Sequence, residues 1–206
     1  MQKIATFIYK GIRKVVIAVW LFISKICSWL IMYGNNIKFY NFHTSGIPFV
    51  SIALGGKCTI GKNFRMNNGN IGNPIGRPQR CILFADKGAA IEIGENVGIS
   101  STAIVSYERI KIGDNVKIGG GVCIYDSDFH SLDSEVRNDA KKDLELKRNK
   151  PVIIGNNVFI GAHSTILKGV TIGENSIVGA SSVVARSIPA NEIWGGNPAK
   201  FLKTLD

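Results

Sequence analysis

Residues 151–200 read PVIIGNNVFIGAHSTILKGVTIGENSIVGASSVVARSIPANEIWGGNPAK, and an aliphatic residue recurs in this stretch at every sixth position. The residues in step are Ile154, Ile160, Ile166, Ile172, Val178 and Val184. A period of six matches neither an α-helix nor one long strand, whose side chains repeat at about 3.6 and 2 residues. It predicts short strands joined by tight turns, with one aliphatic side chain pointing inward on each side of a coil.

The same period extends backwards through the motif Ile-Gly-x-Asn. This motif begins at Ile60, Ile93, Ile112, Ile154 and Ile172. Gly and Asn supply the backbone conformations that tight turns require. Stacked coils of three hexads pair their strands at a spacing of about 4.8 Å. We therefore predict an all-β fold, a triangular parallel solenoid filled with Ile and Val, and the alternative is a β-sandwich with coincidental spacing.

The pattern divides the chain into three parts. Residues 1–40 are basic and apolar, and we expect a helix there. The solenoid is predicted over residues 41–190, interrupted by a polar and highly charged excursion at 131–150 that shows no hexad. An excursion of this length from a regular scaffold is usually functional or disordered. Residues 191–206 contain Gly and Pro and are expected to form a C-terminal cap or tail.

Positive charge is concentrated at the N-terminus. The formal net charge is +10, and residues 1–40 hold six bases and no acid. Nucleic-acid binding is disfavoured, because these basic residues lie on a strongly apolar segment that lacks aromatic side chains on a polar face, on which nucleobases could stack. The four cysteines are scattered without metal-ligand spacing, which indicates a reducing compartment.

Three placements of the N-terminal helix stay open. On a helical wheel its bases and small polar residues share one arc of about 120°, interrupted only by Ile17 and Leu21. This pattern favours an amphipathic helix that contacts the membrane surface through residues 1–33. A helix that spans the membrane would place Lys25 near the bilayer centre, at a cost. The third placement packs the helix against the body or against a sister subunit.

The hexads, together with Ile-Gly-Ala-x-x-x-Ile-Leu-x-Gly-Val-x-Ile-Gly and the later Gly-Asn-Pro-Ala-Lys, resemble the hexapeptide-repeat acyltransferases. The resemblance covers most of residues 50–202. It includes galactoside, maltose and serine acetyltransferases and O-acetyltransferases of surface polysaccharides. It implies a left-handed parallel β-helix and a homotrimer with active sites between neighbouring solenoids. It also implies acetyl-CoA as the acetyl donor and a hydroxyl as the acceptor.

The resemblance assigns the general base to His130, where the repeat gives way to the excursion. Imidazole suits removal of a hydroxyl proton near neutral pH. The alternative is a core histidine, because unbroken register from Ile124 would point this side chain inward. Asp126 or Asp128 is expected to orient the ring, and Asp128 is placed at the substrate-binding site. Either aspartate alternatively serves only to form the turn.

The resemblance assigns cofactor binding to Ala162, Ala180, Ala185, Arg186 and Lys200. The backbone of the first two would line the groove for the pantetheine arm, and the two bases would meet phosphates. His163 is interpreted as an outward residue near that groove, and His43 as structural. No metal is expected, because the histidines and aspartates lack ligand-like spacing.

The resulting hypothesis is an O-acetyltransferase that moves an acetyl group from acetyl-CoA to a sugar hydroxyl. The acceptor would be a surface polysaccharide or its lipid-linked precursor, met in the cytoplasm at the inner face of the membrane. A serine acetyltransferase or an amino-sugar N-acetyltransferase is the enzyme alternative. A non-catalytic trimeric scaffold that docks at the membrane is the alternative outside enzymes.

Overall fold

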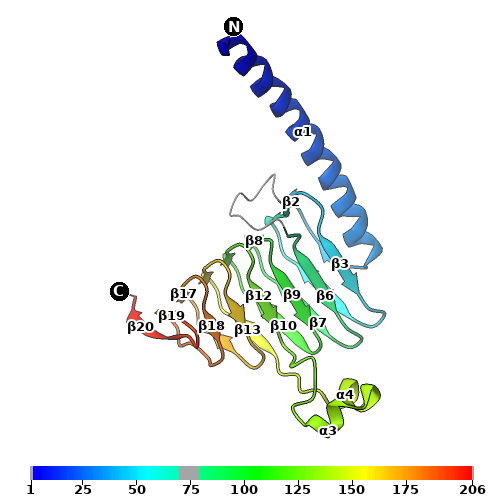
Figure 1. Ribbon diagram of the computed structural model, residues 1–206, viewed down its shortest axis with the longest axis vertical. Coiled ribbons are helices and arrows are strands. Elements are labelled where there is room, and N and C mark those ends of the chain that lie inside the picture. Colours follow the sequence, from blue (N-terminus) through cyan, green and yellow to red (C-terminus); the bar gives the residue numbers. More distant parts are fainter. Residues whose placement is uncertain (1, 70–78, 206) are drawn as a thin grey trace.

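The computed structural model describes residues 2–69 and 79–205, and its body is a solenoid of stacked coils (Figure 1). Successive strands fall in turn on three sheets, so that neighbours in a sheet lie one coil apart in the chain. Sheet A runs in the order β1 (Lys38–Phe39), β4 (Lys57–Ile60), β7 (Ala90–Ile93), β10 (Arg109–Ile112), β13 (Val152–Ile154), β16 (Thr171–Ile172).

Sheet B runs in the order β2 (Phe42–Ser45), β5 (Phe64–Asn67), β8 (Gly98–Ser100), β11 (Lys117–Ile118), β14 (Phe159–Ile160), β17 (Ile177–Val178), β19 (Glu192–Gly195), β20 (Lys200–Thr204). Sheet C runs in the order β3 (Phe49–Ile52), β6 (Ile82–Ala85), β9 (Ala103–Ser106), β12 (Cys123–Tyr125), β15 (Thr165–Ile166), β18 (Val183–Val184). The predicted all-β solenoid is confirmed, and it is consistent with a left-handed β-helix.

Inward aliphatic side chains form continuous ladders through the coils. Ile93 pairs with Ile112, which pairs with Ile154, which pairs with Ile172. None of these four residues is more than 4% exposed. Each coil therefore buries the apolar face of the next, which is the reason a hexad repeat is stable only as a stack.

The corner between sheets A and B explains the Ile-Gly-x-Asn motif. Asn63, Asn96, Asn115, Asn157 and Asn175 adopt left-handed backbone conformations with φ between 58° and 62°. Asn tolerates this region better than other non-glycine residues. Their side-chain amides hydrogen-bond from coil to coil at 3.0 to 3.2 Å, so that the asparagines form a ladder along this corner.

The chain enters through α1 (Gln2–Gly34), a helix that projects away from the first coil (Figure 1). Only Ser24, Ser28 and Met32 of this helix are buried. By length and composition alone, it is the one helix in the described part of the chain that could cross a membrane. At the other end of the solenoid, β19 continues sheet B and β20 folds back on it as an antiparallel partner.

The excursion between β12 and β13 is folded. It contains α3 (Ser134–Arg137) and α4 (Ala140–Leu146). Asp133 accepts hydrogen bonds from the first backbone N–H groups of α3, and Asp139 does the same for α4. These N-caps satisfy donors that a helix start would otherwise leave unpaired. The excursion therefore has local structure of its own below the lower edge of the solenoid in Figure 1.

Replacing Gly94 by Ala should destabilise the stack. A Cβ at this position would lie 2.7 Å from the backbone carbonyl group of Gly113 and would also strike the Asp114 carboxylate. That backbone cannot move without disturbing its own coil, so we expect a loss of about 1–3 kcal/mol in the free energy of unfolding. Denaturant unfolding measures the loss.

Gly98→Ala is the matched control, because its Cβ would meet only the Lys117 side chain, at 3.6 Å. We expect this variant to stay within about 0.5 kcal/mol of the unmodified protein. Equal losses in the two variants would contradict the role of the close approach at Gly94.

Candidate active site

The candidate site lies on the edge where the chain passes from sheet C to sheet A, called here the C–A edge. Asp126 directly follows β12 at this edge and is fully buried. Its carboxylate accepts hydrogen bonds from the Ser106 hydroxyl at 2.7 Å and from the backbone N–H groups of Tyr107 and Glu108 at 2.7 and 3.0 Å. Asp126 therefore fixes the turn of the preceding coil and does not reach His130.

Phe129 redirects the chain just before His130. Its backbone is left-handed, with φ of 63°, and its ring makes edge contacts with Tyr107 and Tyr125 at centroid distances of 5.7 and 5.1 Å. This contact turns the next side chain away from the solenoid. His130 is consequently 69% exposed, and the interpretation of it as a core histidine is wrong.

His130 is paired with a carboxylate from within the excursion. Its Nδ1 lies 2.7 Å from Oδ2 of Asp143 on α4, whose side chain is only 11% exposed. The other carboxylate oxygen, Oδ1, accepts the backbone N–H of Ser131. The hydrogen bond from His130, followed by that from Ser131, holds the pKa of Asp143 below its usual value. An ionised Asp143 keeps the proton of His130 on Nδ1 and leaves Nε2 as the free basic nitrogen.

The expectation that Asp126 or Asp128 orients His130 is therefore wrong, since Asp143 does so. Asp128 instead pairs with Lys168, whose Nζ lies 3.2 Å from Oδ1. Its Oδ2 is buried and has no hydrogen-bond partner among the described residues. Asp128 thus connects the start of the excursion to the turn that contains Lys168, which is the next turn along the C–A edge.

The excursion is held against the solenoid by a cation. Lys147, directly after α4, places its Nζ 3.4 Å from the centroid of the Tyr107 ring. Burial lowers the pKa of Lys147, and burial followed by the charges of Asp86 and Asp126 raises that of Tyr107. Tyr107 thereby contacts both Phe129 and Lys147, and it links the aromatic cluster to the excursion.

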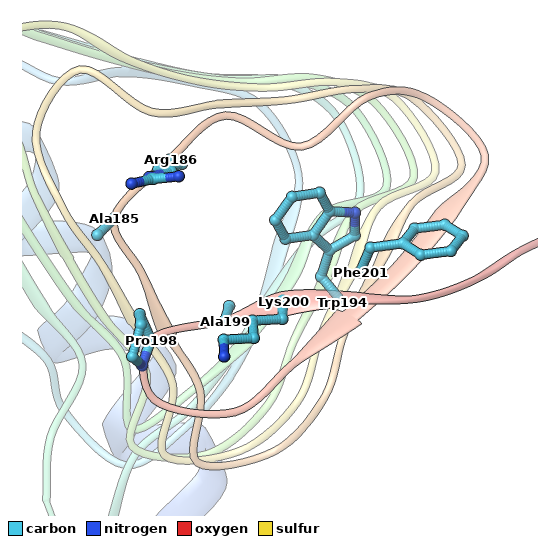
Figure 2. Close-up of a pocket in the computed structure, with 7 residues that line it drawn as sticks. All are labelled: Ala185, Arg186, Trp194, Pro198, Ala199, Lys200 and Phe201. Atoms are coloured by element: carbon cyan, nitrogen blue, oxygen red, sulfur yellow. The ribbon is translucent and has the colours of Figure 1, made fainter.

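A second feature lies at the C-terminal mouth of the solenoid. It is a pocket of about 530 Å³ lined by Ala185, Arg186, Trp194, Pro198, Ala199, Lys200 and Phe201 (Figure 2). Arg186 and Lys200 approach it from opposite sides, with the Trp194 and Phe201 rings along a third. Three of the residues predicted to bind cofactor therefore share one basic pocket, which suits an anionic group.

The other two predicted cofactor residues lie elsewhere, on the edge between sheets B and C, called here the B–C edge. Ala162 and Ala180 stack there one coil apart, and the N–H of Ser181 donates to the Ala162 carbonyl at 2.8 Å. His163, beside Ala162, has φ of 64° and packs its ring against Gly121. The predicted site residues thus fall into two groups, one at each border of sheet C.

The predicted site residues on the C–A edge follow one another from coil to coil. His130 follows β12, Lys168 follows β15 and Arg186 follows β18, and these strands are consecutive in sheet C. The corners before His130 and Arg186 are therefore two coils apart, which is about 10 Å at the usual strand spacing. In the described part of the chain, no three His, Cys, Asp or Glu side chains gather where they could hold a metal ion.

Comparisons with known proteins agree with this architecture. A model of the family described as bacterial transferase hexapeptide (six repeats) matches residues 151–186. A putative lipopolysaccharide biosynthesis O-acetyl transferase of Escherichia coli, WbbJ, is 32% identical over 151 residues, which cover 72% of each chain. Protein CapG of Staphylococcus aureus is 50% identical over 97 residues, covering 47% of this chain and 54% of CapG.

A solved structure is also similar. The hexapeptide-repeat acetyltransferase of Vibrio cholerae, in complex with acetyl coenzyme A, has a TM-score of 0.52 and 34% identity over 60% of this chain and 64% of its own. The chain belongs to the family of bacterial hexapeptide-repeat transferases, and the resemblance inferred from sequence is confirmed. The chain spans about three fifths of the length of several curated relatives, between 54% and 62%.

Asp143 is the residue that the sequence did not single out. It is one of five acids between residues 131 and 150, and it follows His130 by thirteen positions. One signal was present: Asp139 precedes Ala-Lys-Lys-Asp, and an aspartate is a favoured N-cap. That signal predicts a short helix but does not say which of its residues meets His130.

Replacing Asp143 by Asn should lower stability at neutral pH but not in acid. A carboxylate whose pKa is lowered by folding stabilises the folded state above its unfolded pKa of about 3.9. This contribution is lost as the pH falls through the lower folded pKa. Denaturant unfolding at several pH values between neutrality and pH ~2 measures the difference between the two proteins.

The difference in unfolding free energy should be present at pH ~7 and should vanish at the acid end of the series. Asp133→Asn is a useful comparison, because Asp133 caps a helix of the same excursion without touching His130. A difference between Asp143→Asn and the unmodified protein that stays constant with pH would contradict the role of the ionised carboxylate.

Proposed function

We propose that this protein is an acetyl-CoA-dependent O-acetyltransferase that acts on a sugar hydroxyl, with His130 as the general base. The observation that carries the proposal is the exposed His130, oriented by a nearly buried carboxylate, on the edge that leads to a basic pocket. The family adds support, because WbbJ is named an O-acetyl transferase of lipopolysaccharide biosynthesis. A surface polysaccharide, or its lipid-linked precursor, is the acceptor class that we propose.

The proposed reaction is a direct transfer. Nε2 of His130 accepts the proton of the acceptor hydroxyl while its oxygen attacks the thioester carbonyl of acetyl-CoA. The carbon–sulfur bond then breaks, and the imidazolium returns the proton to the leaving thiolate. Asp143 stabilises the positive charge that His130 carries between these steps, as a carboxylate does in a catalytic triad. The products are an acetyl ester and free coenzyme A.

The cofactor would lie along the C–A edge. Arg186 and Lys200 are the cations of the terminal pocket and would hold the phosphates of acetyl-CoA. The extended arm of the cofactor would then run from this pocket past the turn at Lys168 towards His130. The order of the residues supports this path. His130, Lys168 and Arg186 follow consecutive strands of sheet C, so they lie at equivalent corners of successive coils.

We also propose a homotrimer, in which Ala162 and Ala180 on the B–C edge of one copy face the C–A edge of the next. The outward face of sheet C supports such an assembly. Phe49 on this face is 51% exposed, and the face continues with half-buried Ile82, Phe84, Val105, Cys123, Tyr125 and Val183. Sheet A differs, since its outward side chains include the ion pair of Arg109 with Glu92.

The inner face of the cell membrane is the location that we propose. Acetyl-CoA is a cytoplasmic metabolite, and a lipid-linked acceptor is anchored at that surface. The long apolar helix α1 next to the first coil supports this placement.

His130→Ala should lower the rate of acetyl transfer by about 10²–10⁴-fold, the usual contribution of a positioned general base. Asp143→Asn should lower kcat more than it raises the KM for acetyl-CoA, because it acts through His130 and not on the cofactor. Thiol release from acetyl-CoA in the presence of extracted surface glycan measures both.

His43→Ala is the matched control, because His43 is exposed on β2 and far along the chain from the candidate site. It should leave transfer near the unmodified rate. Full activity of correctly folded His130→Ala would exclude His130 as the base. Protein that neither binds coenzyme A nor releases thiol with any glycan would favour a scaffold without activity.

Arg186→Ala and Lys200→Ala should each weaken coenzyme A binding by about 10-fold or more, since each removes a charge-assisted contact with phosphate. Calorimetry at two ionic strengths measures the binding. The affinity of the two variants for coenzyme A should depend less on salt than that of the unmodified protein. Lys203→Ala removes an exposed cation of the same strand outside the pocket and should bind normally. An equal loss in all three variants would indicate a general effect of charge.

A further inference from the structure

The helix α1 meets the solenoid along one line. Ser24, Ser28 and Met32 are buried and follow one another at intervals of four residues, which places them on one side of the helix. Ile17 and Leu21, which interrupt the polar arc in the sequence, are half-buried and continue the same line. The polar arc of the second half of α1 is therefore its contact with the body.

The opposite side of α1 is a continuous apolar surface. It runs the length of the helix, about 50 Å at 1.5 Å per residue. Its residues are each between 43% and 69% exposed: Ile4, Ile8, Ile12, Val15, Val16, Val19, Phe22, Ile23, Ile26, Trp29, Leu30 and Tyr33. A surface of this size needs a partner, because soluble monomers rarely leave such a patch in water.

The charges of α1 argue against a helix that crosses the membrane. Its buried side chains begin at Ser24, so residues 2–23 carry none. These residues span about 33 Å, close to the hydrocarbon core of about 30 Å, so length alone permits a crossing. Such a segment would hold Lys10, Arg13 and Lys14 near its middle, and cations are costly at membrane depth.

Charge identifies the partner. The helix α1 contains five bases and no acid. Four of them, at Lys3, Lys10, Arg13 and Lys14, lie on the same side of the helix as the buried serines, away from the apolar surface. A helix with this division places its apolar side among acyl chains and its cations at the level of lipid headgroups. Anionic headgroups complement such cations.

We propose that α1 lies in the plane of an anionic phospholipid leaflet, with its apolar side buried and the solenoid standing on the water side. This inference rests on the membrane location in the proposed function and deepens it by naming the lipid class and the orientation. Trp29 and Tyr33, whose rings stack at 5.1 Å, then lie at the interface, where amphipathic rings are favoured.

Binding of the full chain to vesicles tests the proposal. Vesicles of phosphatidylcholine with about 30% phosphatidylserine should retain the protein in a flotation gradient, and vesicles of phosphatidylcholine alone should retain much less. Salt at about 0.5 M should release a large part of it, because exposed charges are then screened. Alkaline carbonate should extract the rest, as it does for proteins that do not span the bilayer.

Two variants separate the apolar and charged contributions. Ile12→Glu with Val19→Glu should abolish flotation, because both positions lie on the exposed apolar side. Lys10→Gln, Arg13→Gln and Lys14→Gln together should weaken binding to the anionic vesicles by roughly 100-fold, given the usual contribution of each base. Leu54→Glu with Leu132→Glu is the matched control, since both leucines are exposed outside α1, and it should bind normally.

Several outcomes would overturn the proposal. Equal binding to neutral vesicles with resistance to carbonate would show a spanning helix. An absence of vesicle binding, together with a self-association that Ile12→Glu with Val19→Glu abolishes, would show that a second copy covers the helix. These assays use no acetyl-CoA, and His130→Ala should bind vesicles normally. Failure of membrane docking and failure of the catalytic proposal are therefore distinguishable.

Discussion

The structure depends on the stacking of inward aliphatic side chains, each directly over its equivalent in the previous coil. Ile93, Ile112 and Ile154 share one register and are almost completely buried. A shift of one residue would turn such a set from the core to the solvent, and burial contributes about 25 cal/mol for each Å² of apolar surface. The strands of successive coils must therefore keep one register, and the corners between them line up along the solenoid.

These edges bring together residues that are far apart in the sequence. The turn at Tyr107, the excursion with His130 and the turn at Lys168 follow one another on the C–A edge because β9, β12 and β15 are neighbours. The excursion does not disturb this order. Its two ends are tied by the hydrogen bond from the N–H of Lys150 to the Asp126 carbonyl, at 2.8 Å. A long insertion is tolerated at this position because sheet A resumes in register after it.

The repeat was predictable because each coil needs an inward aliphatic side chain and a tight turn. The same residue types therefore recur at the same positions of each hexad. The hexad that contains Ile154 predicted the fold, and the end of the repeat predicted where the excursion leaves. The orientation of His130 was not predictable in this way. It depends on the left-handed backbone of Phe129, which is held by contacts with Tyr107 and Tyr125 from other coils.

Asp143 and α1 show the same limit. Tertiary contact selects Asp143 from five acids in the excursion, and no periodicity marks it. For α1, the helical wheel found the polar arc but left three placements of the helix open. In the structure, Ser24 and Ser28 of that arc are buried at the end of the helix next to the solenoid. Sequence therefore predicted which residues share a side of the helix, and only the folded chain showed what that side contacts.

The stacked coils also connect the helix rigidly to the candidate site. In sheet C, β12 lies three strands after β3, so the excursion leaves about 15 Å along the solenoid from the first coil. Every described strand between the first coil and β12 is paired on both sides, so the two belong to one continuous stack. On the proposed membrane, His130 would then keep a fixed orientation towards acceptors anchored in the same leaflet. Confinement to one surface raises the effective concentration of such acceptors, so the site needs little affinity of its own for the sugar.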